Sequence, residues 1–246
     1  MDEGPRNGQV VLLLHGQPDW SYLYRKMIPL IVDAGHRVIV PDMIGMGRSD
    51  KPTNKDTHTI YAHAGWWKAM IDALELKDIT LFGQDWGGFT SLMVVAQHPE
   101  CFRRVMVSNC GLWLMPDPIL NVPQGINRED YPVDADAKVR TFDDFVADCN
   151  AKGYLKEDMS DFFFAWMRYA LTGPELKASD NLRRDFGGIE LTEDEVRAYD
   201  APFPDEIFMT GIRTLPSMGS LIDTQRSLAD WEALKMLGLS LIHISE

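Results

Sequence analysis

The sequence lacks several features that would place it in a specialised class of protein. It has three cysteines in 246 residues, Cys101, Cys110 and Cys149, at unrelated spacings. This odd, scattered set excludes a disulfide scaffold and a cysteine-rich zinc site, so we expect a cytoplasmic protein that binds no metal. No apolar run approaches the ~20 residues that a membrane-spanning helix requires, so we expect no membrane partner.

Positive charge is also scarce. Twenty-four Lys and Arg residues stand against 37 Asp and Glu residues, and the formal net charge is −13 without a basic stripe. Binding to nucleic acid needs clustered cations, so we expect no nucleic-acid partner. The apolar fraction of 45% and the charged fraction of 25% are ordinary for a folded protein. The length fits one α/β or all-β domain that carries an insertion.

Strand and helix signals alternate as far as Cys110. Apolar runs at residues 9–14, 36–40, 78–82 and 104–108 predict strands, and helical spacing predicts helices over residues 22–34, 59–76 and 86–97. Strands that are apolar on both faces and separated by helices are typical of a parallel sheet covered on both sides. We therefore predict an α/β protein with a doubly wound, mostly parallel sheet.

The alternation stops after Cys110. Between Gly111 and about Pro216 a proline-rich stretch precedes amphipathic helices that are predicted to begin at Thr141, at Ser160 and at a capping box on Thr192. Such an insertion forms a cap over the carboxyl ends of parallel strands, where ligands bind. We predict a core at residues 1–115, a helical cap at 116–215, a returning core helix at 216–238 and a tail at 239–246.

The sharpest local motif is GQDWGG at residues 83–88, which follows a predicted strand and precedes a predicted helix. It has the Gly-x-nucleophile-x-Gly spacing of a nucleophile elbow, with Asp85 in place of serine. Such a turn favours a positive φ and exposes the side chain beside a helix N-terminus, whose N–H groups keep a carboxylate ionised. The alternative is an aspartate that only caps the helix in a glycine-rich loop.

An aspartate nucleophile suits displacement at a saturated carbon. The product is an ester that water can hydrolyse, whereas a serine would leave an ether. Hydrolysis of the ester develops an oxyanion on Asp85, which needs two N–H donors. We expect the backbone N–H groups of Trp86 and Gln17 to form this oxyanion hole.

Four stretches resemble haloalkane dehalogenases of the α/β-hydrolase fold, over about residues 2–236. They are HGQPDWSYLYRKMIP, PDMIGMGRSDKP, GQDWGGF and AYDAPFPD. The resemblance implies a nucleophilic Asp85, halide binding by Trp86 and Trp166, and Gln17 at the oxyanion position. It also implies hydrolysis of a small apolar haloalkane by water through an aspartyl alkyl ester, without any cofactor.

The cap residues leave two alternatives open. An indole N–H such as that of Trp166 suits a halide, whereas an epoxide opens to an alkoxide that a phenol such as Tyr154 or Tyr169 must protonate. Epoxide hydrolysis is therefore the rival reaction, and Trp166 could simply be a core aromatic. We also predict an apolar substrate pocket, with ordinary core packing as its alternative. The predicted pocket residues are Phe89, Phe163, Leu215 and Pro216.

The ends of the chain carry a separate hypothesis. Turnover needs an acid and a histidine base beyond the cap, and only His243 of the six histidines follows it, in a sequence context unlike that of the family. Residues 1–4 resemble the middle of the family's N-terminal region, and residues 239–246 resemble translated adapter sequence. We predict a monomeric gene fragment with a foreign tail and a sheet incomplete at both ends. A non-catalytic binding module is the alternative.

Overall fold

The computed structural model describes residues 1–110, 125–154, 159–182, 190–222, 224–237 and 243–244. Its sheet has the strand order β1-β3-β2-β4-β5-β6. The strands are β1 (Asp2–Glu3), β2 (Val10–Leu14), β3 (Arg37–Ile39), β4 (Ile79–Gln84), β5 (Phe102–Ser108) and β6 (His243–Ile244). Only β1 pairs antiparallel, with β3. The predicted mostly parallel sheet is confirmed.

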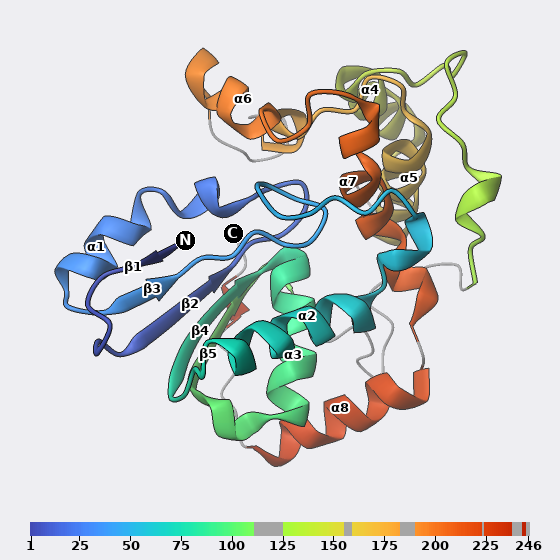
Figure 1. Cartoon of the computed structure of the whole chain (residues 1–246). Helices are drawn as coiled ribbons and strands as arrows, with labels where there is room; N and C mark the ends of the chain where they lie inside the picture. Colours follow the sequence, from blue (N-terminus) through green and yellow to red (C-terminus); the bar gives the residue numbers. More distant parts are fainter. Residues whose placement is uncertain (111–124, 155–158, 183–189, 223, 238–242, 245–246) are drawn as a thin grey trace.

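Helices cover both faces of the sheet, because β2 is apolar on both sides. Leu12 and Leu14 point into a core with the helices α2 (Ile60–Ala73), α3 (Asp85–Gln97) and α8 (Thr224–Met236). Val11 and Leu13 point into the second core, beneath α1 (Met27–Asp33). Figure 1 shows α2, α3 and α8 on one side of the sheet and α1 on the other. This is the doubly wound arrangement that the sequence predicts.

The helix predicted over residues 22–34 is wrong in its first half. A 3₁₀ turn, η1 (Ser21–Tyr24), comes first, and α1 begins only at Met27. Pro29 explains the break, because a proline lacks the N–H of a helical hydrogen bond and is tolerated only in the first turn. The other predicted helices and strands of residues 9–108 are found within a few residues of their expected ends.

The predicted cap lies beyond the edge of the sheet where β4 passes into α3 (Figure 1). Its helices are α4 (Phe142–Lys152), α5 (Met159–Thr172), α6 (Glu193–Asp200) and α7 (Thr210–Thr214). Helix α4 begins after Thr141 as predicted, with a capping box that was not predicted, and the predicted capping box at Thr192 begins α6. The described part of residues 125–215 contains no strand. The predicted boundary at residues 115/116 and the proline-rich stretch lie outside the described residues.

The two outermost strands are not predicted by the sequence. Asp2 and Glu3 of β1 pair with Ile39 and Val38, and β6, which falls in the predicted foreign tail, pairs with Val107 and Ser108 of β5. Neither segment is long enough to show an apolar pattern. An edge strand presents unpaired N–H and C=O groups that any extended segment can satisfy, and this accounts for both pairings.

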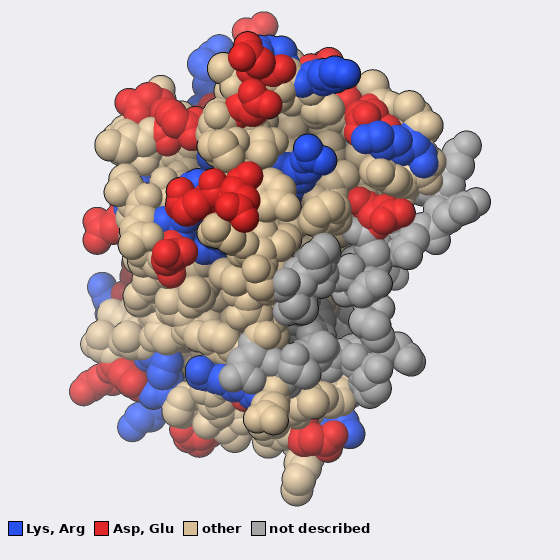
Figure 2. Space-filling view, turned by 90° about the vertical axis from the view of Figure 1, so that its right-hand side faces the viewer, with Lys and Arg blue, Asp and Glu red and all other residues tan. Residues whose placement is uncertain are grey.

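The surface shows no concentration of positive charge on the face seen in Figure 2. Lys and Arg side chains alternate there with Asp and Glu side chains. This matches the absence of a basic stripe from the sequence. None of the described helices is both long and apolar enough to span a membrane. The three cysteines are free thiols, with Cys110 and Cys149 buried and Cys101 half-buried.

Candidate active site

Asp85 lies at the sharp junction between β4 and α3. Its φ is 51°, in the left-handed region that residues with a Cβ rarely adopt. The N-cap of α3 is Gln84, and Asp85 is already the first helical residue. Asp85 is therefore more than a helix cap, and the strained turn predicted for a nucleophile elbow is present.

Glycines let three segments of backbone meet around this turn. A Cβ on Gly87 would lie 2.3 Å from the carbonyl oxygen of His15, and one on Gly88 would lie 2.1 Å from Sγ of Cys110. A Cβ on Gly16 would lie 2.3 Å from both Cβ and Oδ1 of Asp85. A larger residue at Gly16 or Gly87 would push the loop after β2 away from the turn at Asp85, and one at Gly88 would collide with Cys110.

The predicted backbone donors do reach Asp85. The N–H of Gln17 donates to Oδ1 at 2.9 Å, and the N–H of Trp86 also bonds to this carboxylate. Burial nevertheless raises the pKa of Asp85 to about 6, against the lowering effect of the two N–H donors. The carboxylate is still mostly ionised at pH 7. Burial, which the sequence reasoning did not weigh, opposes the N–H donors that were expected to keep this carboxylate ionised.

The loop that carries Gln17, residues 15–20, is called the oxyanion loop below. His15 lies at its start and is fully buried, with Nε2 accepting from the N–H of Met43 at 2.9 Å and Nδ1 2.8 Å from the carbonyl oxygen of Gly16. At its centre, Nε2 of Gln17 donates to the carbonyl oxygen of Ile212 at 2.9 Å. The loop is thus fixed to the core and to α7.

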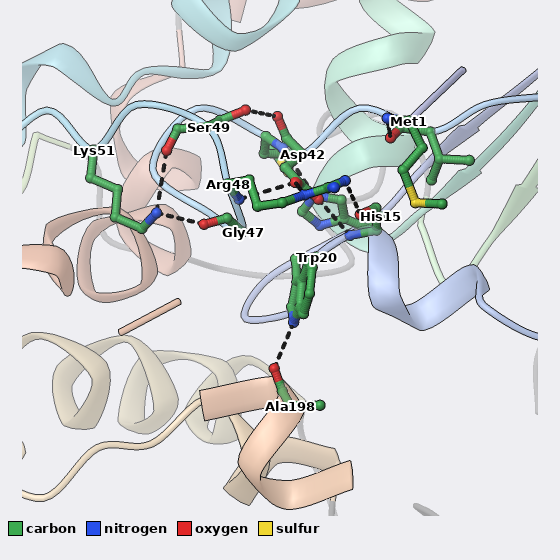
Figure 3. A network of polar contacts seen from close by, with 12 residues as sticks. Met1, His15, Trp20, Asp42, Gly47, Arg48, Ser49, Lys51 and Ala198 are labelled. Atoms are coloured by element: carbon green, nitrogen blue, oxygen red, sulfur yellow. Dashed lines mark hydrogen bonds and ion pairs between the residues drawn. The ribbon is translucent and has the colours of Figure 1, made fainter. Parts of the chain in front are cut away.

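A second set of polar contacts holds the end of the oxyanion loop (Figure 3). Asp42 accepts from the N–H of Ser21 at 2.7 Å and from the N–H of Arg48 at 3.0 Å. Burial opposes ionisation, but these donors leave the pKa of Asp42 lowered. The indole of Trp20 donates to the carbonyl oxygen of Ala198 at 3.2 Å and thereby ties the loop to α6 of the cap.

Trp166 lies on α5 and is 8% exposed. Its ring lies 6.3 Å from Phe142, 5.7 Å from Phe145 and 6.0 Å from Tyr169, all in the cap. It belongs to the same buried apolar cluster as Trp86. These contacts are those of a packed core aromatic, and halide binding by Trp166 stays a prediction.

The predicted pocket residues are all at least half-buried. The rings of Phe89 and Trp86 lie 5.4 Å apart, Leu215 is fully buried in the apolar cluster, and Phe163 packs against that cluster. Pro216 is buried in the short 3₁₀ segment η8 (Leu215–Leu221). The positions agree with a dry pocket lining and with core packing alike.

The two cap phenols line a different cavity. Tyr154 and Tyr169 contribute to a hollow of about 390 Å³ between α4, α5 and residues 134–139. Among the described residues, the buried hydroxyl of Tyr169 has no hydrogen-bond partner, and burial raises its pKa well above the usual value of a phenol. It therefore stays protonated over the whole physiological range.

One acidic residue of the site was missed by the sequence reasoning. Asp19, in the oxyanion loop, is 4% exposed, and its Oδ1 has no hydrogen-bond partner among the described residues. Burial and the charge of Asp85 raise the pKa of Asp19 to about 8. The sequence did contain a pattern that could have identified Asp19. It is an acidic residue directly after His-Gly-Gln-Pro, in the loop that is expected to lie beside the nucleophile.

The described histidines are engaged elsewhere. Nδ1 of His58 lies 3.3 Å from Nε2 of His63, and burial keeps the pKa of both rings low. His243 is described only through its backbone in β6. Within the described residues, no three His, Cys, Asp or Glu side chains gather in a way that could hold a metal ion.

Comparisons with known proteins agree with this architecture. A family model described as alpha/beta hydrolase fold matches residues 9–155. A haloalkane dehalogenase from Psychrobacter cryohalolentis is 36% identical over 217 residues, which cover 88% of this chain and 58% of the relative. A haloalkane dehalogenase from Mycobacterium marinum is 34% identical over 239 residues, which cover 95% of this chain and 66% of the relative.

Solved structures point the same way. A haloalkane dehalogenase from Paraglaciecola agarilytica NO2, described as tetrameric, is 27% identical with a TM-score of 0.69, and the match covers 99% of this chain and 68% of that one. The chain spans less than two thirds of the length of the curated relatives it matches. The predicted monomer stays a prediction.

Proposed function

The chain belongs to the alpha/beta hydrolase fold family and is a relative of haloalkane dehalogenases, and from this premise we propose that Asp85 displaces halide from a haloalkane. One observation carries the proposal. The carboxylate of Asp85 stands in a left-handed turn, with one oxygen held at 2.9 Å by the N–H of Gln17. An ordinary helix cap would need neither feature.

In the proposed step an oxygen of Asp85 attacks the halogen-bearing carbon. The C–O bond forms as the carbon–halogen bond breaks, and the halogen leaves with the bonding electrons as halide. The product is an alkyl ester on Asp85. A partly desolvated carboxylate favours this attack, because burial has already removed much of the water that would stabilise it.

The leaving halide needs hydrogen-bond donors and no proton. The indole N–H groups of Trp86 and Trp166 are assigned this role, since indole donates without accepting and its ring is apolar. Both side chains belong to one buried cluster, with Phe89 and Phe163 packed against it. A small apolar haloalkane is the substrate class that such surroundings favour.

Hydrolysis of the ester requires a base that activates water. The oxyanion formed in that step would be stabilised by the N–H groups of Gln17 and Trp86. The described histidines His15, His58 and His63 are buried and bonded to other groups. We assign none of them as base, and we expect the chain with the printed sequence to stop at the ester.

Intact-protein and peptide mass spectrometry after addition of 1,2-dibromoethane tests the proposal. We expect one bromoethyl group per chain on Asp85, with one bromide released. Asp85→Asn abolishes the adduct. Asp78→Asn is the matched control, because Asp78 also has a φ of 51° but is an exposed loop residue.

Other outcomes would decide against parts of the proposal. If no haloalkane forms an adduct, the nucleophilic role of Asp85 is refuted and a binding module is favoured. An adduct formed by an epoxide but by no haloalkane favours the rival reaction. Sustained bromide release that depends on Asp85 would contradict arrest at the ester.

A further inference from the structure

Asp19 lies at a place where no obvious structural need explains a carboxyl group. It is 4% exposed, and the described hydrogen bonds include none to its Oδ1. The ionisable groups that act on it or are acted on by it come from three elements: Asp85 of α3, Tyr24 of η1 and Tyr199 of α6. No cation is among them.

The carboxyl groups of Asp19 and Asp85 differ in the hydrogen bonds that they accept. Asp85 receives the N–H groups of Gln17 and Trp86, whereas Oδ1 of Asp19 receives none. The hydroxyl of Tyr24 donates to the carbonyl oxygen of Leu14 at 2.9 Å and that of Tyr199 accepts from Arg25 at 3.2 Å, and no described hydrogen bond joins either phenol to Oδ1 of Asp19. Two buried carboxyl groups without a cation do not both ionise, and the one with N–H donors ionises first.

We propose that Asp19 is a positioning residue of the site, a neutral acid that retains its proton while Asp85 is ionised, so that the nucleophile carries the only negative charge there. The order of the two pKa values, about 6 for Asp85 and about 8 for Asp19, agrees with this assignment. The loss of the Asp19 proton above neutral pH then changes the electrostatic environment of the attack without removing the nucleophile.

The cap keeps Asp19 dry. On α6, Glu195 forms an ion pair with Arg25 of the core, and the indole of Trp20 donates to Ala198. Tyr199 lies on the same helix, and the charge of Asp19 contributes to the raised pKa of this phenol. The protonation of Asp19 should therefore depend on how tightly α6 closes.

The first test needs no substrate. Infrared spectroscopy of the whole chain at pH 7 should show the C=O stretch of a protonated carboxyl group, and Asp19→Asn should remove it. Persistence of the same band in the variant, or its absence from the wild type, would overturn the proposal. This outcome is independent of whether Asp85 forms an adduct.

The second test rests on the proposed function and measures the rate of Asp85 alkylation by 1,2-dibromoethane between pH 5 and pH 10. The wild-type profile should contain two ionisations. Asp19→Asn should lose the upper one and keep the lower one at the same pH, because one neutral group replaces another. If Asp19 is ionised at pH 7, the variant instead moves the lower ionisation to lower pH, and the proposal fails.

A second pair of variants tests the inference without altering Asp19. Glu195→Ala breaks the ion pair with Arg25 and should admit water, which shifts the upper ionisation to lower pH. Asp194→Ala is the control, because Asp194 lies on the same helix and pairs only with exposed Arg197. If the upper ionisation occurred at the same pH in both variants and in the wild type, the role assigned to α6 would be contradicted.

Discussion

The core wall of the candidate site and the cap wall that is predicted to face it are built in different ways. The core wall consists of the oxyanion loop and Asp85, and hydrogen bonds of 2.7–3.1 Å fix His15, Gly16 and Gln17 of the loop and Ser21 directly after it. The cap wall, where α4 and α5 pack together, is an aromatic cluster around Phe145 and Trp166 with ring distances of 5.2–6.3 Å. The core wall is held by hydrogen bonds, which require a particular direction, whereas the cap wall is held by side chains that fill a volume.

This difference predicts how each wall tolerates change. A hydrogen-bonded loop has one functional geometry. A substitution that introduces a small clash there should therefore reduce activity strongly even when the protein stays folded. An aromatic cluster can repack around a substitution, so it loses stability in proportion to the volume removed. The following variants are designed to break or sharpen this contrast.

The largest effect is expected for Gly16→Ala in the core wall. The new Cβ would lie 2.3 Å from Oδ1 of Asp85 and must displace the oxyanion loop. We expect alkylation of Asp85 to slow by roughly 100-fold or more, the size typical for loss of one oxyanion donor. Single-turnover mass spectrometry measures this rate.

Gly65→Ala is the matched control for that substitution. Gly65 is exposed in α2, and no atom lies within 4 Å of the position of an added Cβ. We expect it to raise the free energy of unfolding by about 0.5–1 kcal/mol and to leave alkylation intact. Equal rates for Gly16→Ala and Gly65→Ala would show that the core wall is not the rigid element described here.

Phe145→Ala probes the cap wall. Phe145 is 2% exposed and contacts the rings of Phe142, Phe162, Trp166 and Tyr169. Its removal should lower the free energy of unfolding by about 3–5 kcal/mol. At a temperature where the variant is folded, it should slow alkylation less than Gly16→Ala does. Urea unfolding measures the first effect.

Phe208→Ala serves as the comparison for the cap variant, because Phe208 is 36% exposed. It should cost well under half as much free energy of unfolding. If Phe145→Ala slowed alkylation as much as Gly16→Ala does, the contrast would fail. Trp166, which packs against Phe145, would then have a direct role in the reaction rather than only a packing role.

The smallest expected effect is a difference in pH dependence. No histidine lies between His98 and His243 in the sequence, so the buried histidines belong to the core side. Burial, and then the neighbouring His58, lower the pKa of His63 from 6.5 to about 3. The unfolded chain therefore binds the proton first, and stability falls as pH drops from 6.5 toward 3.

Replacing His63 with Gln should reduce that loss. Between pH 7.5 and pH 5.0 the decrease in the free energy of unfolding should be smaller than in the wild type by about 1–2 kcal/mol. Asp19 acts with the opposite sign, since its raised pKa favours folding as pH falls, but it is common to both proteins and cancels.

The sequence was sufficient for those features that depend on spacing. The turn at Asp85, the N–H of Gln17, the helix start at Thr141 and the capping box at Thr192 are all local patterns, and the structure has each where it was predicted. The parallel sheet was predictable because strands that are apolar on both faces are typical of a sheet covered by helices on both sides.

Features that depend on what lies next to a residue in space were not predictable. The importance of Asp19 comes from the loss of solvent around it and from its proximity to Asp85, which is 66 positions away in the chain. The surroundings of Trp166 depend on how α4 packs against α5. The pairings of β1 and β6 depend on free sheet edges, which a pattern of a few residues cannot indicate.

The burial of the thiols has a practical consequence for chemoselectivity. Haloalkanes are alkylating agents, and a thiolate would compete with any carboxylate for them. Burial raises the pKa of Cys110 to about 12 and that of Cys149 to about 11, and it also raises the pKa of Cys101. All three sulfurs thus remain weakly reactive thiols at neutral pH. Under the proposed function, this low thiol reactivity would leave a haloalkane to react with Asp85 rather than with a cysteine.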